Sequence, residues 1–401
     1  MDKIGHKEAI NIVEYSESDE TIFTDEELQI LRTEFKGKLG VIPTFTGQHI
    51  LKALEYVGVV ILPHHIIKIR PKVSNTNFMS MIMYALKLPE LRTEDFPALI
   101  HNDFYHILIR FLLHEIDSLL ERGLYKGYIT KLDNLTCVRG KILFKQHLLH
   151  NQNRNDKVYC SYSEVTIDTI ENRILRFTLF YLSQYYFLDD NTKIEIIEYY
   201  RKFDKIALLR SISLDIFESI RYTPLNDHYR TAMNLCELIL RDSSLDIERD
   251  GEKNSLSFLI NMEDLFQKFV ANLLAIKFGE EKVFLQKTEY IDIGRKLRVT
   301  PDIQILSNNK VVAILDTKYK EIGNSYPPSE HSVQVHSYSV SRTNKCVLIY
   351  ASTKSIGKME YPLTGGINLF TLHFNLVSSS KEEFDQNCCN FIKEVISIIQ
   401  N

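Results

Sequence analysis

Two acidic residues and a lysine in the last third of the chain have types and spacing that suit metal-dependent hydrolysis. Asp302 follows a Thr-Pro pair, and Asp316 and Lys318 stand two residues apart. Side chains two apart in a strand share a face, and a turn at Ser307–Asn309 would bring Asp302 beside them. Paired carboxylates can hold Mg²⁺, which activates water and offsets charge in phosphodiester hydrolysis. The lysine would orient the water and stabilise the same charge.

The same residues also allow a purely structural interpretation, a surface hairpin in which Asp316 and Lys318 form an ion pair. The apolar run Val311–Leu315 leads directly into Asp316, which favours a buried strand with the charges at its mouth. Charge on a buried strand is costly unless it is paired or binds a metal. Both interpretations stay open on this pattern alone.

Two neighbouring groups extend the pattern. A predicted helix before the motif contains Glu263 and Asp264, and we choose Glu263 as the acid that helps to bind metal or water. Gln334 and Tyr338 follow the motif at i, i+4, which places them on one helix face. The alternative for each group is structural: exposed helix acids in the first case, a packed tyrosine and a surface glutamine in the second.

The complete order resembles the PD-(D/E)xK nucleases, and the Gln334–Tyr338 pair is similar to the QxxxY element of RecB-like nucleases. Further segments resemble McrC, the nuclease subunit of the McrBC modification-dependent restriction system. This similarity covers about residue 55 to the end, through the segments 58–72, 84–91, 139–141, 171–175 and 262–270.

The resemblance implies a Mg²⁺-dependent DNA endonuclease subunit. McrC-like proteins act with McrB, a hexameric AAA+ GTPase that recognises modified cytosine in double-stranded DNA. Their N-terminal domain docks into the McrB ring and stimulates GTP hydrolysis. The residues implied to hold the metal are Asp302, Asp316, the Thr317 carbonyl group and Glu263. Three other residues are implied to act in catalysis. Lys318 activates the attacking water, and Gln334 and Tyr338 orient the lysine or contact DNA.

Two alternatives to this function remain. The first is a stand-alone RecB-like nuclease that needs no GTP, and the second is a docking subunit that regulates a GTPase without cleaving DNA. The chain has no GxxxxGK[ST] loop, so we expect GTP to bind to the partner and not to this chain. Intact Asp302, Asp316 and Lys318 argue against the docking subunit.

The elements that must position these residues suggest a multi-domain α+β protein. Its 401 residues allow two or three domains. We predict a mixed α/β docking domain over 1–155, a helical middle region over 156–255, and a restriction-endonuclease-like α/β domain over 256–401. The polar segment 151–157 is the predicted linker. Expected helices cover 102–122, 169–186, 194–209, 229–240, 257–278, 333–339 and 391–399. Expected strands cover 9–15, a hairpin at 58–70, 283–290, 297–306, 310–319, 345–351 and 369–374.

Composition excludes several classes of protein. The net charge of -4 argues against a protein that coats nucleic acid by bulk positive charge. Six cysteines without a CxxC pair indicate reduced thiols and a cytoplasmic location. No apolar run approaches the ~20 residues of a membrane helix, so we expect no membrane association.

Overall fold

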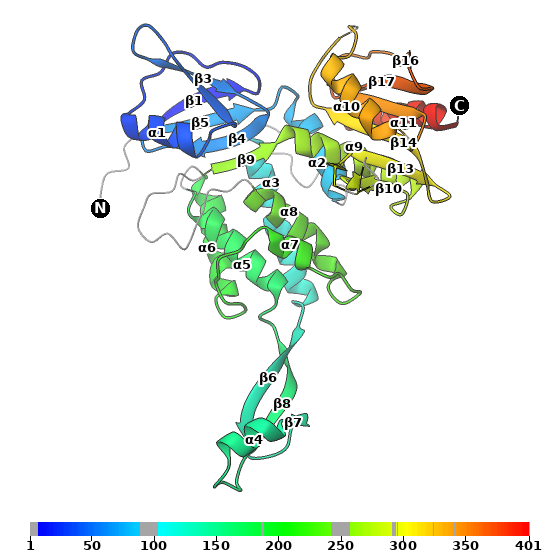
Figure 1. The fold of residues 1–401 in the computed structure, drawn as a ribbon. Coiled ribbons are helices and arrows are strands. Elements are labelled where there is room, and N and C mark those ends of the chain that lie inside the picture. The colour runs from blue at the N-terminus through cyan, green and yellow to red at the C-terminus, as the bar shows by residue number, and fades with distance from the viewer. Residues whose placement is uncertain are drawn as a thin grey trace. The chain divides into compact units, whose positions relative to one another are not determined.

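The computed structural model describes residues 7–88, 103–185, 188–241, 257–290, 294, 296–323, 325–340 and 342–400. Contacts group the chain into two compact units (Figure 1). The first unit combines residues 1–107 with 253–401, and the second contains 108–241. The predicted division into three domains stays a prediction. Residues 242–254, whose charged composition predicts a loop, lie outside the described residues.

The N-terminal part of the first unit is built on a four-stranded sheet in the order β1-β5-β4-β9. Its strands are β1 (Glu8–Val13), β5 (His65–Arg70), β4 (Tyr56–Ile61) and β9 (Ser257–Asn261). β1 runs parallel to β5, and the other pairs are antiparallel. The predicted hairpin at 58–70 is confirmed as β4 and β5.

The predicted helix at 257–278 is wrong over its first five residues. These residues form β9, which pairs with β4 from a position about two hundred residues away in the chain. Helix α9 (Met262–Phe278) begins only after Asn261, whose side chain caps it. A short apolar run looks the same in a buried strand and in a buried helix, so periodicity alone did not separate them.

Gly58 makes the close β4–β9 pairing possible. Its φ is +144°, and a Cβ atom there would lie 1.9 Å from the carbonyl oxygen of Phe258. We therefore expect Gly58→Ala to lower the free energy of unfolding by about 3 kcal/mol. The control is Gly47→Ala, where φ is +80° but no atom lies within 4 Å. Thermal unfolding measures both variants, and equal losses would contradict the steric argument.

Helix α1 (Asp25–Thr33) and the hairpin of β2 (Leu39–Pro43) and β3 (His49–Ala53) share the apolar core of this sheet. Helix α2 (Asn75–Leu86) follows the sheet's β5 strand and packs mainly against α9. Thr24 caps α1, because its side chain accepts from the Glu27 amide and Glu27 accepts from the Thr24 amide. Thr24 and Glu27 stand at the sequence spacing of a capping box, and the structure confirms one.

The C-terminal part of the first unit is a six-stranded sheet in the order β10-β13-β14-β15-β17-β16. Its strands are β10 (Val283–Leu285), β13 (Ile303–Ser307), β14 (Lys310–Lys318), β15 (Lys345–Ser352), β17 (Ile367–Asn375) and β16 (Met359–Leu363). β14, β15 and β17 are parallel, while β10, β13 and β16 add antiparallel edges. A separate pair consists of β11 (Glu289–Tyr290) and β12 (Arg298–Val299).

Helices cover both faces of this sheet. On one face, α10 (Ser329–Ser339) joins β14 to β15 and buries Val335 against Ile314 and Leu348. On the other face, α9 and α11 (Lys381–Gln400) pack through aromatic rings onto Phe374 of β17. Parallel strands covered on both faces leave their carboxyl ends as the place where polar side chains can gather.

The second unit contains helices and one three-stranded sheet. The helices are α3 (Phe104–Arg122), which starts in the first unit, α4 (Phe144–His150), α5 (Ile170–Ser183), α6 (Asp190–Phe203), α7 (Asp215–Ser219), the 3₁₀ turn η3 (Asp227–Tyr229) and α8 (Arg230–Arg241). Strands β6 (Gly127–Leu135), β8 (Val158–Thr166) and β7 (Lys141–Ile142) form the sheet. β6 and β8 extend from the helices as a long ribbon that ends at α4 (Figure 1). We call residues 127–166 the arm.

The predicted linker at 151–157 is wrong. This segment joins α4 to β8 inside the arm, and Asn151 is 6% exposed because Asn134 and Lys157 hold its side chain. Its polar composition reflects a loop at the end of a ribbon. Among the described helices, none combines the length and the apolar character that crossing a membrane would require.

Candidate active site

The predicted acidic pair and lysine lie at the carboxyl end of β14. Ala313, Ile314 and Leu315 are buried in the strand, and Asp316, which follows them, is fully buried. Asn308 and Asn309 have φ of +50° and +61°, so they form the tight turn that pairs β13 with β14. Ile303 stands opposite Leu315 in this pairing, which brings Asp302 to the end of β14.

Asp302 is held in place by Thr317. The Asp302 Oδ2 atom accepts hydrogen bonds from the Thr317 backbone N–H at 2.8 Å and from its hydroxyl group at 2.9 Å. Burial raises the pKa of Asp302, and these two hydrogen bonds together with the charge of Lys318 oppose the rise. Only the carbonyl group of Thr317 was predicted to act in the site, so this role of its amide and hydroxyl groups was missed.

Asp316 is a buried carboxylate that pairs with Lys318. Lys318 Nζ lies 2.6 Å from Asp316 Oδ2, while Asp316 Oδ1 accepts no hydrogen bond from the described residues. Burial, then the charge of Asp302, raises the pKa of Asp316 to about 6, although Lys318 opposes this. A buried carboxylate oxygen without a hydrogen-bond partner is suited to bind a metal ion.

Lys318 is linked to helix α10 by a chain of hydrogen bonds. Its Nζ donates to Gln334 Oε1 at 3.2 Å, and Gln334 Nε2 donates to the Tyr338 hydroxyl at 2.9 Å. Gln334 and Tyr338 thus share one helix face, as their spacing predicted. Burial would lower the pKa of Lys318, but the charges of Asp316 and Asp302 outweigh it and the pKa is raised. The ammonium form therefore persists at neutral pH.

Glu263 and Asp264 are both exposed at the start of α9, where Asn261 caps their amides. Partial burial, then the charge of Glu55, raises the pKa of Glu263, while Lys320 and Lys318 lower it. Glu263 also acts on Asp316, and Asp264 acts on Asp302. Both acids therefore lie within electrostatic range of the pair, and the choice of Glu263 as the functional acid stays a prediction.

The residues at the end of β14 fit a magnesium ion better than a zinc ion. No group of three or more His, Cys, Asp or Glu side chains with metal-binding geometry occurs in the described part of the chain. Mg²⁺ commonly takes only one or two carboxylates and completes its shell with water, whereas zinc needs three or four protein ligands. The carboxylates of Asp302 and Asp316 meet the first requirement, and Asp316 Oδ1 has no hydrogen-bond partner among the described residues.

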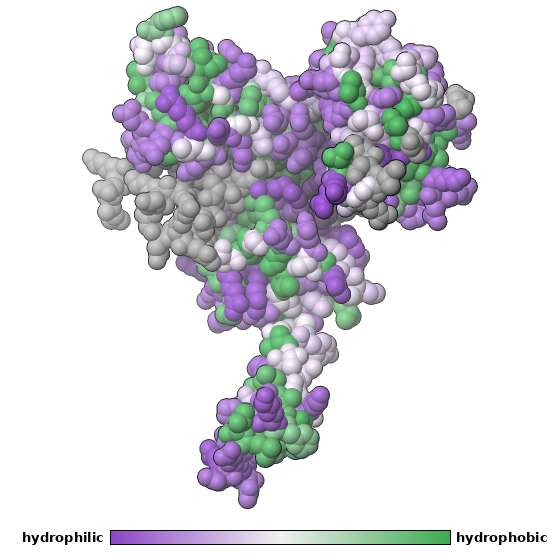
Figure 2. All heavy atoms as spheres, in the orientation of Figure 1, coloured by the Kyte–Doolittle hydropathy of each residue, from purple (hydrophilic) through white to green (hydrophobic). Residues whose placement is uncertain are grey.

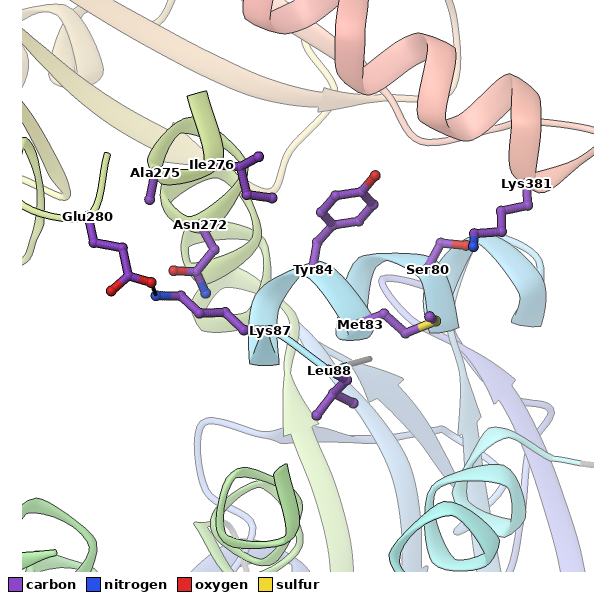
Figure 3. Close-up of a pocket in the computed structure, with 10 residues that line it drawn as sticks. All are labelled: Ser80, Met83, Tyr84, Lys87, Leu88, Asn272, Ala275, Ile276, Glu280 and Lys381. Atoms are coloured by element: carbon purple, nitrogen blue, oxygen red, sulfur yellow. Dashed lines mark hydrogen bonds and ion pairs between the residues drawn. The ribbon is translucent and has the colours of Figure 1, made fainter. Parts of the chain in front are cut away.

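A separate cavity of about 340 Å³ lies away from this site (Figure 3). Helices α2 and α9, the start of α11 and the residues that follow α2 and α9 line it with Ser80, Met83, Tyr84, Lys87, Leu88, Asn272, Ala275, Ile276, Glu280 and Lys381. Lys87 and Glu280 form an ion pair of 2.6 Å at its edge. None of the predicted site residues lines this cavity, so we expect the reaction to take place at the carboxyl end of β14 instead.

The fold and the site define a mixed α/β protein in which two carboxylates and a lysine meet at the carboxyl end of a covered sheet. A family model described as the McrBC 5-methylcytosine restriction system component matches residues 51–351. The chain therefore belongs to this family, and the predicted relationship to McrC is confirmed.

The chain is also similar to a known protein and to solved structures. The chain is 23% identical over 319 residues to the "Type IV methyl-directed restriction enzyme EcoKMcrBC" of Escherichia coli K12, covering 74% of this chain and 91% of that protein. A chain of the refined half-complex of Thermococcus gammatolerans McrB AAA+ hexamers with bound McrC superposes with a TM-score of 0.59 at 17% identity. That match covers 96% of this chain and 100% of the other, and it shows a shared fold. The cryo-EM structure of the Thermococcus gammatolerans McrBC complex gives a TM-score of 0.48 at 17% identity, over 67% and 87% of the two chains.

Proposed function

We propose that this chain is the Mg²⁺-dependent endonuclease subunit of a modification-dependent restriction system, with a PD-(D/E)xK site. It acts with an McrB-like AAA+ GTPase, whose GTP hydrolysis it stimulates, on double-stranded DNA that contains modified cytosine. The observation that supports this most directly is the fully buried Asp316 carboxylate beside Asp302, which pairs with Lys318 at 2.6 Å through Oδ2 and whose Oδ1 accepts no hydrogen bond from the described residues.

Each side chain has a distinct task in this mechanism. Asp302 and Asp316, with the Thr317 carbonyl group, would hold Mg²⁺, which supplies Lewis-acid activation of water when it is bound. Glu263 would help to bind the metal or its water from the start of α9. Thr317 fixes the Asp302 carboxylate through two hydrogen bonds. Lys318 orients the attacking water and offsets the negative charge that develops on the phosphate.

The arm supports docking to a protein partner. It exposes large apolar side chains on both strands and on α4 (Figure 2), among them Tyr128, Leu132, Phe144, Leu148 and Leu149, each more than half exposed. A ribbon with so many uncovered apolar side chains is typical of an interaction surface. The McrC of the Thermococcus gammatolerans assembly is bound to McrB AAA+ hexamers, and we propose an equivalent hexamer as the partner here.

DNA cleavage tests this function. Methylated and unmethylated plasmids are incubated with the chain and Mg²⁺, with or without the McrB-like protein and with or without GTP. We expect cleavage only when the partner, GTP, Mg²⁺ and methylated DNA are all present. Cleavage by the chain alone, independent of GTP, would support a stand-alone nuclease instead. Stimulation of GTP hydrolysis without any cleavage would support a docking subunit.

Gln334 should contribute through the position of Lys318. We expect Gln334→Leu to lower the rate of cleavage about tenfold, because it removes the acceptor that holds the ammonium group. Gln334→Glu keeps the acceptor and should stay closer to wild type. Single-turnover cleavage under saturating DNA measures both variants, and equal rates for Gln334→Leu and wild type would rule out this role.

A further inference from the structure

Tyr319 directly follows Lys318 and is in contact with the N-terminal segment of the chain. It is 1% exposed, and its hydroxyl group donates to Glu14 Oε1 at 2.9 Å. The hydroxyl group of Tyr15 donates to its backbone carbonyl at 3.4 Å. The ammonium group of Lys72 lies 4.2 Å from the centre of its ring. Residues that are about three hundred positions apart therefore meet at the end of the active-site strand.

A strained turn brings the N-terminal residues to this place. Tyr15 has a φ of +59°, a left-handed conformation that is rare for a bulky residue. Ser16 closes the turn, since its amide and its hydroxyl group both donate to the carbonyl oxygen of Val13, at 3.1 and 2.7 Å. Strain of this kind persists where the surroundings over-determine the conformation, often beside a functional site.

Glu14, which accepts the hydrogen bond from Tyr319, is unusual because its carboxylate is buried. It is 3% exposed, and its Oε1 atom accepts from both the Tyr319 hydroxyl group and the Lys72 backbone N–H at 2.8 Å. Its Oε2 atom has no hydrogen-bond partner among the described residues. Burying a carboxylate is costly, and an apolar pair of the same volume would often stabilise the fold as well or better. The arrangement thus favours a role in positioning over a role in stability.

Tyr319 is also held from the side of helix α9. Its ring centroid lies 5.8 Å from that of Phe266, which is fully buried one turn after Glu263. Lys318 instead reaches Gln334 of α10, the helix on the opposite face of the sheet. The end of the strand is therefore fixed from one face through Tyr319, while Lys318 projects into the site from the other.

We propose that Glu14, Tyr15 and Tyr319 form a clasp that positions Lys318 for the reaction. All three are positioning residues, because they act through Lys318 and not on the DNA. This inference rests on the proposed nuclease function and adds to it a requirement for the N-terminal segment at the active site.

Cleavage kinetics of four variants test the clasp, using the full chain with its partner, GTP and methylated DNA. Tyr319→Phe and Glu14→Leu remove one side of the hydrogen bond, and we expect each to lower kcat about tenfold with KM for DNA unchanged. Glu14→Gln keeps an acceptor oxygen and should remain within about twofold of wild type. The matched control is Tyr105→Phe. Tyr105 is 2% exposed, and its hydroxyl group donates a similar hydrogen bond to Asp103. Both residues are distant from Lys318 in sequence.

Hydrogen–deuterium exchange on the chain alone gives a second measurement that needs no cleavage. We expect Tyr319→Phe to speed exchange in the peptide 314–320, and Tyr105→Phe to leave it unchanged. If wild type does not cut DNA, the proposed function fails while exchange still judges the clasp. Unchanged exchange, a kcat that Tyr319→Phe does not alter, or an equal effect of Tyr105→Phe would each overturn the proposal.

Discussion

Asp316→Ala should reduce Mg²⁺-dependent DNA cleavage by at least about a thousandfold while leaving the protein folded. Asp316 is the fully buried member of the acidic pair; its Oδ2 atom pairs with Lys318, and its Oδ1 atom accepts no hydrogen bond from the described residues. Alanine removes a metal ligand and a buried charge together. We therefore expect the variant to lose activity without losing stability, because the buried negative charge of Asp316 is costly to the fold without a metal.

Three measurements separate this prediction from general damage. Stimulation of GTP hydrolysis in the partner should survive Asp316→Ala, since the arm does not contain the site. Asp103→Ala is the control for a structural carboxylate: Asp103 pairs with Lys68 at 2.9 Å, so its loss should lower the melting temperature but preserve cleavage. A cleavage rate for Asp316→Ala within about tenfold of wild type would remove Asp316 from the mechanism.

The central part of the site was predictable because it is local in sequence. A spacing of two places Asp316 and Lys318 on one face of a strand, and the Asn308-Asn309 turn fixes Asp302 opposite them. The placement of Gln334 and Tyr338 on one helix face followed in the same way from a spacing of four. No long-range information was needed for any of these positions.

The rest of the site depends on contacts that leave no local signal. Glu14 and Tyr319 are 305 positions apart, and neither has a pattern around it that indicates the other. The hydroxyl group of Thr317 was missed for a different reason: a threonine in a strand is expected for its β propensity, and only the structure shows that it holds Asp302.

The same distinction applies to the fold. The long amphipathic helices α3, α5 and α8 and the buried strands β14, β15 and β17 were predicted, because burial produces a clear hydrophobic pattern. Strands β6 and β8 were missed, since most of their side chains are at least partly exposed and no core face imposes an alternation. Strand β9 was merged with α9, because its pairing partner β4 lies far away in sequence.

The stability of the protein should depend on pH in a way that Mg²⁺ reverses. Burial raises the pKa of Asp316 to about 6, from an ordinary value near 4. A carboxyl group whose pKa is higher in the folded state favours folding when it is protonated. This contribution to the free energy of unfolding is about 3 kcal/mol. It is fully present below about pH 4 and is lost as the pH rises through about 6. The raised pKa of Asp302 acts in the same direction.

Mg²⁺ binds the ionised carboxylates, so it should restore stability only where they are deprotonated. Saturation at about a hundred times the dissociation constant would add about 2.7 kcal/mol. We therefore expect Mg²⁺ to raise the melting temperature by several degrees at pH 8 and to have little effect at pH 5. Thermal unfolding at both pH values, with Mg²⁺ or with a chelator, measures this difference.

Asp316→Asn supplies the decisive comparison for the metal effect. The amide cannot ionise, so this variant should be more stable than wild type at pH 8 without metal and should gain little from Mg²⁺. Asp385→Asn changes a carboxylate that accepts from Tyr84 at 2.9 Å, away from the predicted metal ligands, and should keep the full Mg²⁺ effect. A Mg²⁺ effect on the melting temperature of equal size at pH 5 and pH 8, or one that persists in Asp316→Asn, would mean that the metal binds elsewhere. The raised pKa of Asp316 would then reflect its burial alone and not a metal-binding role.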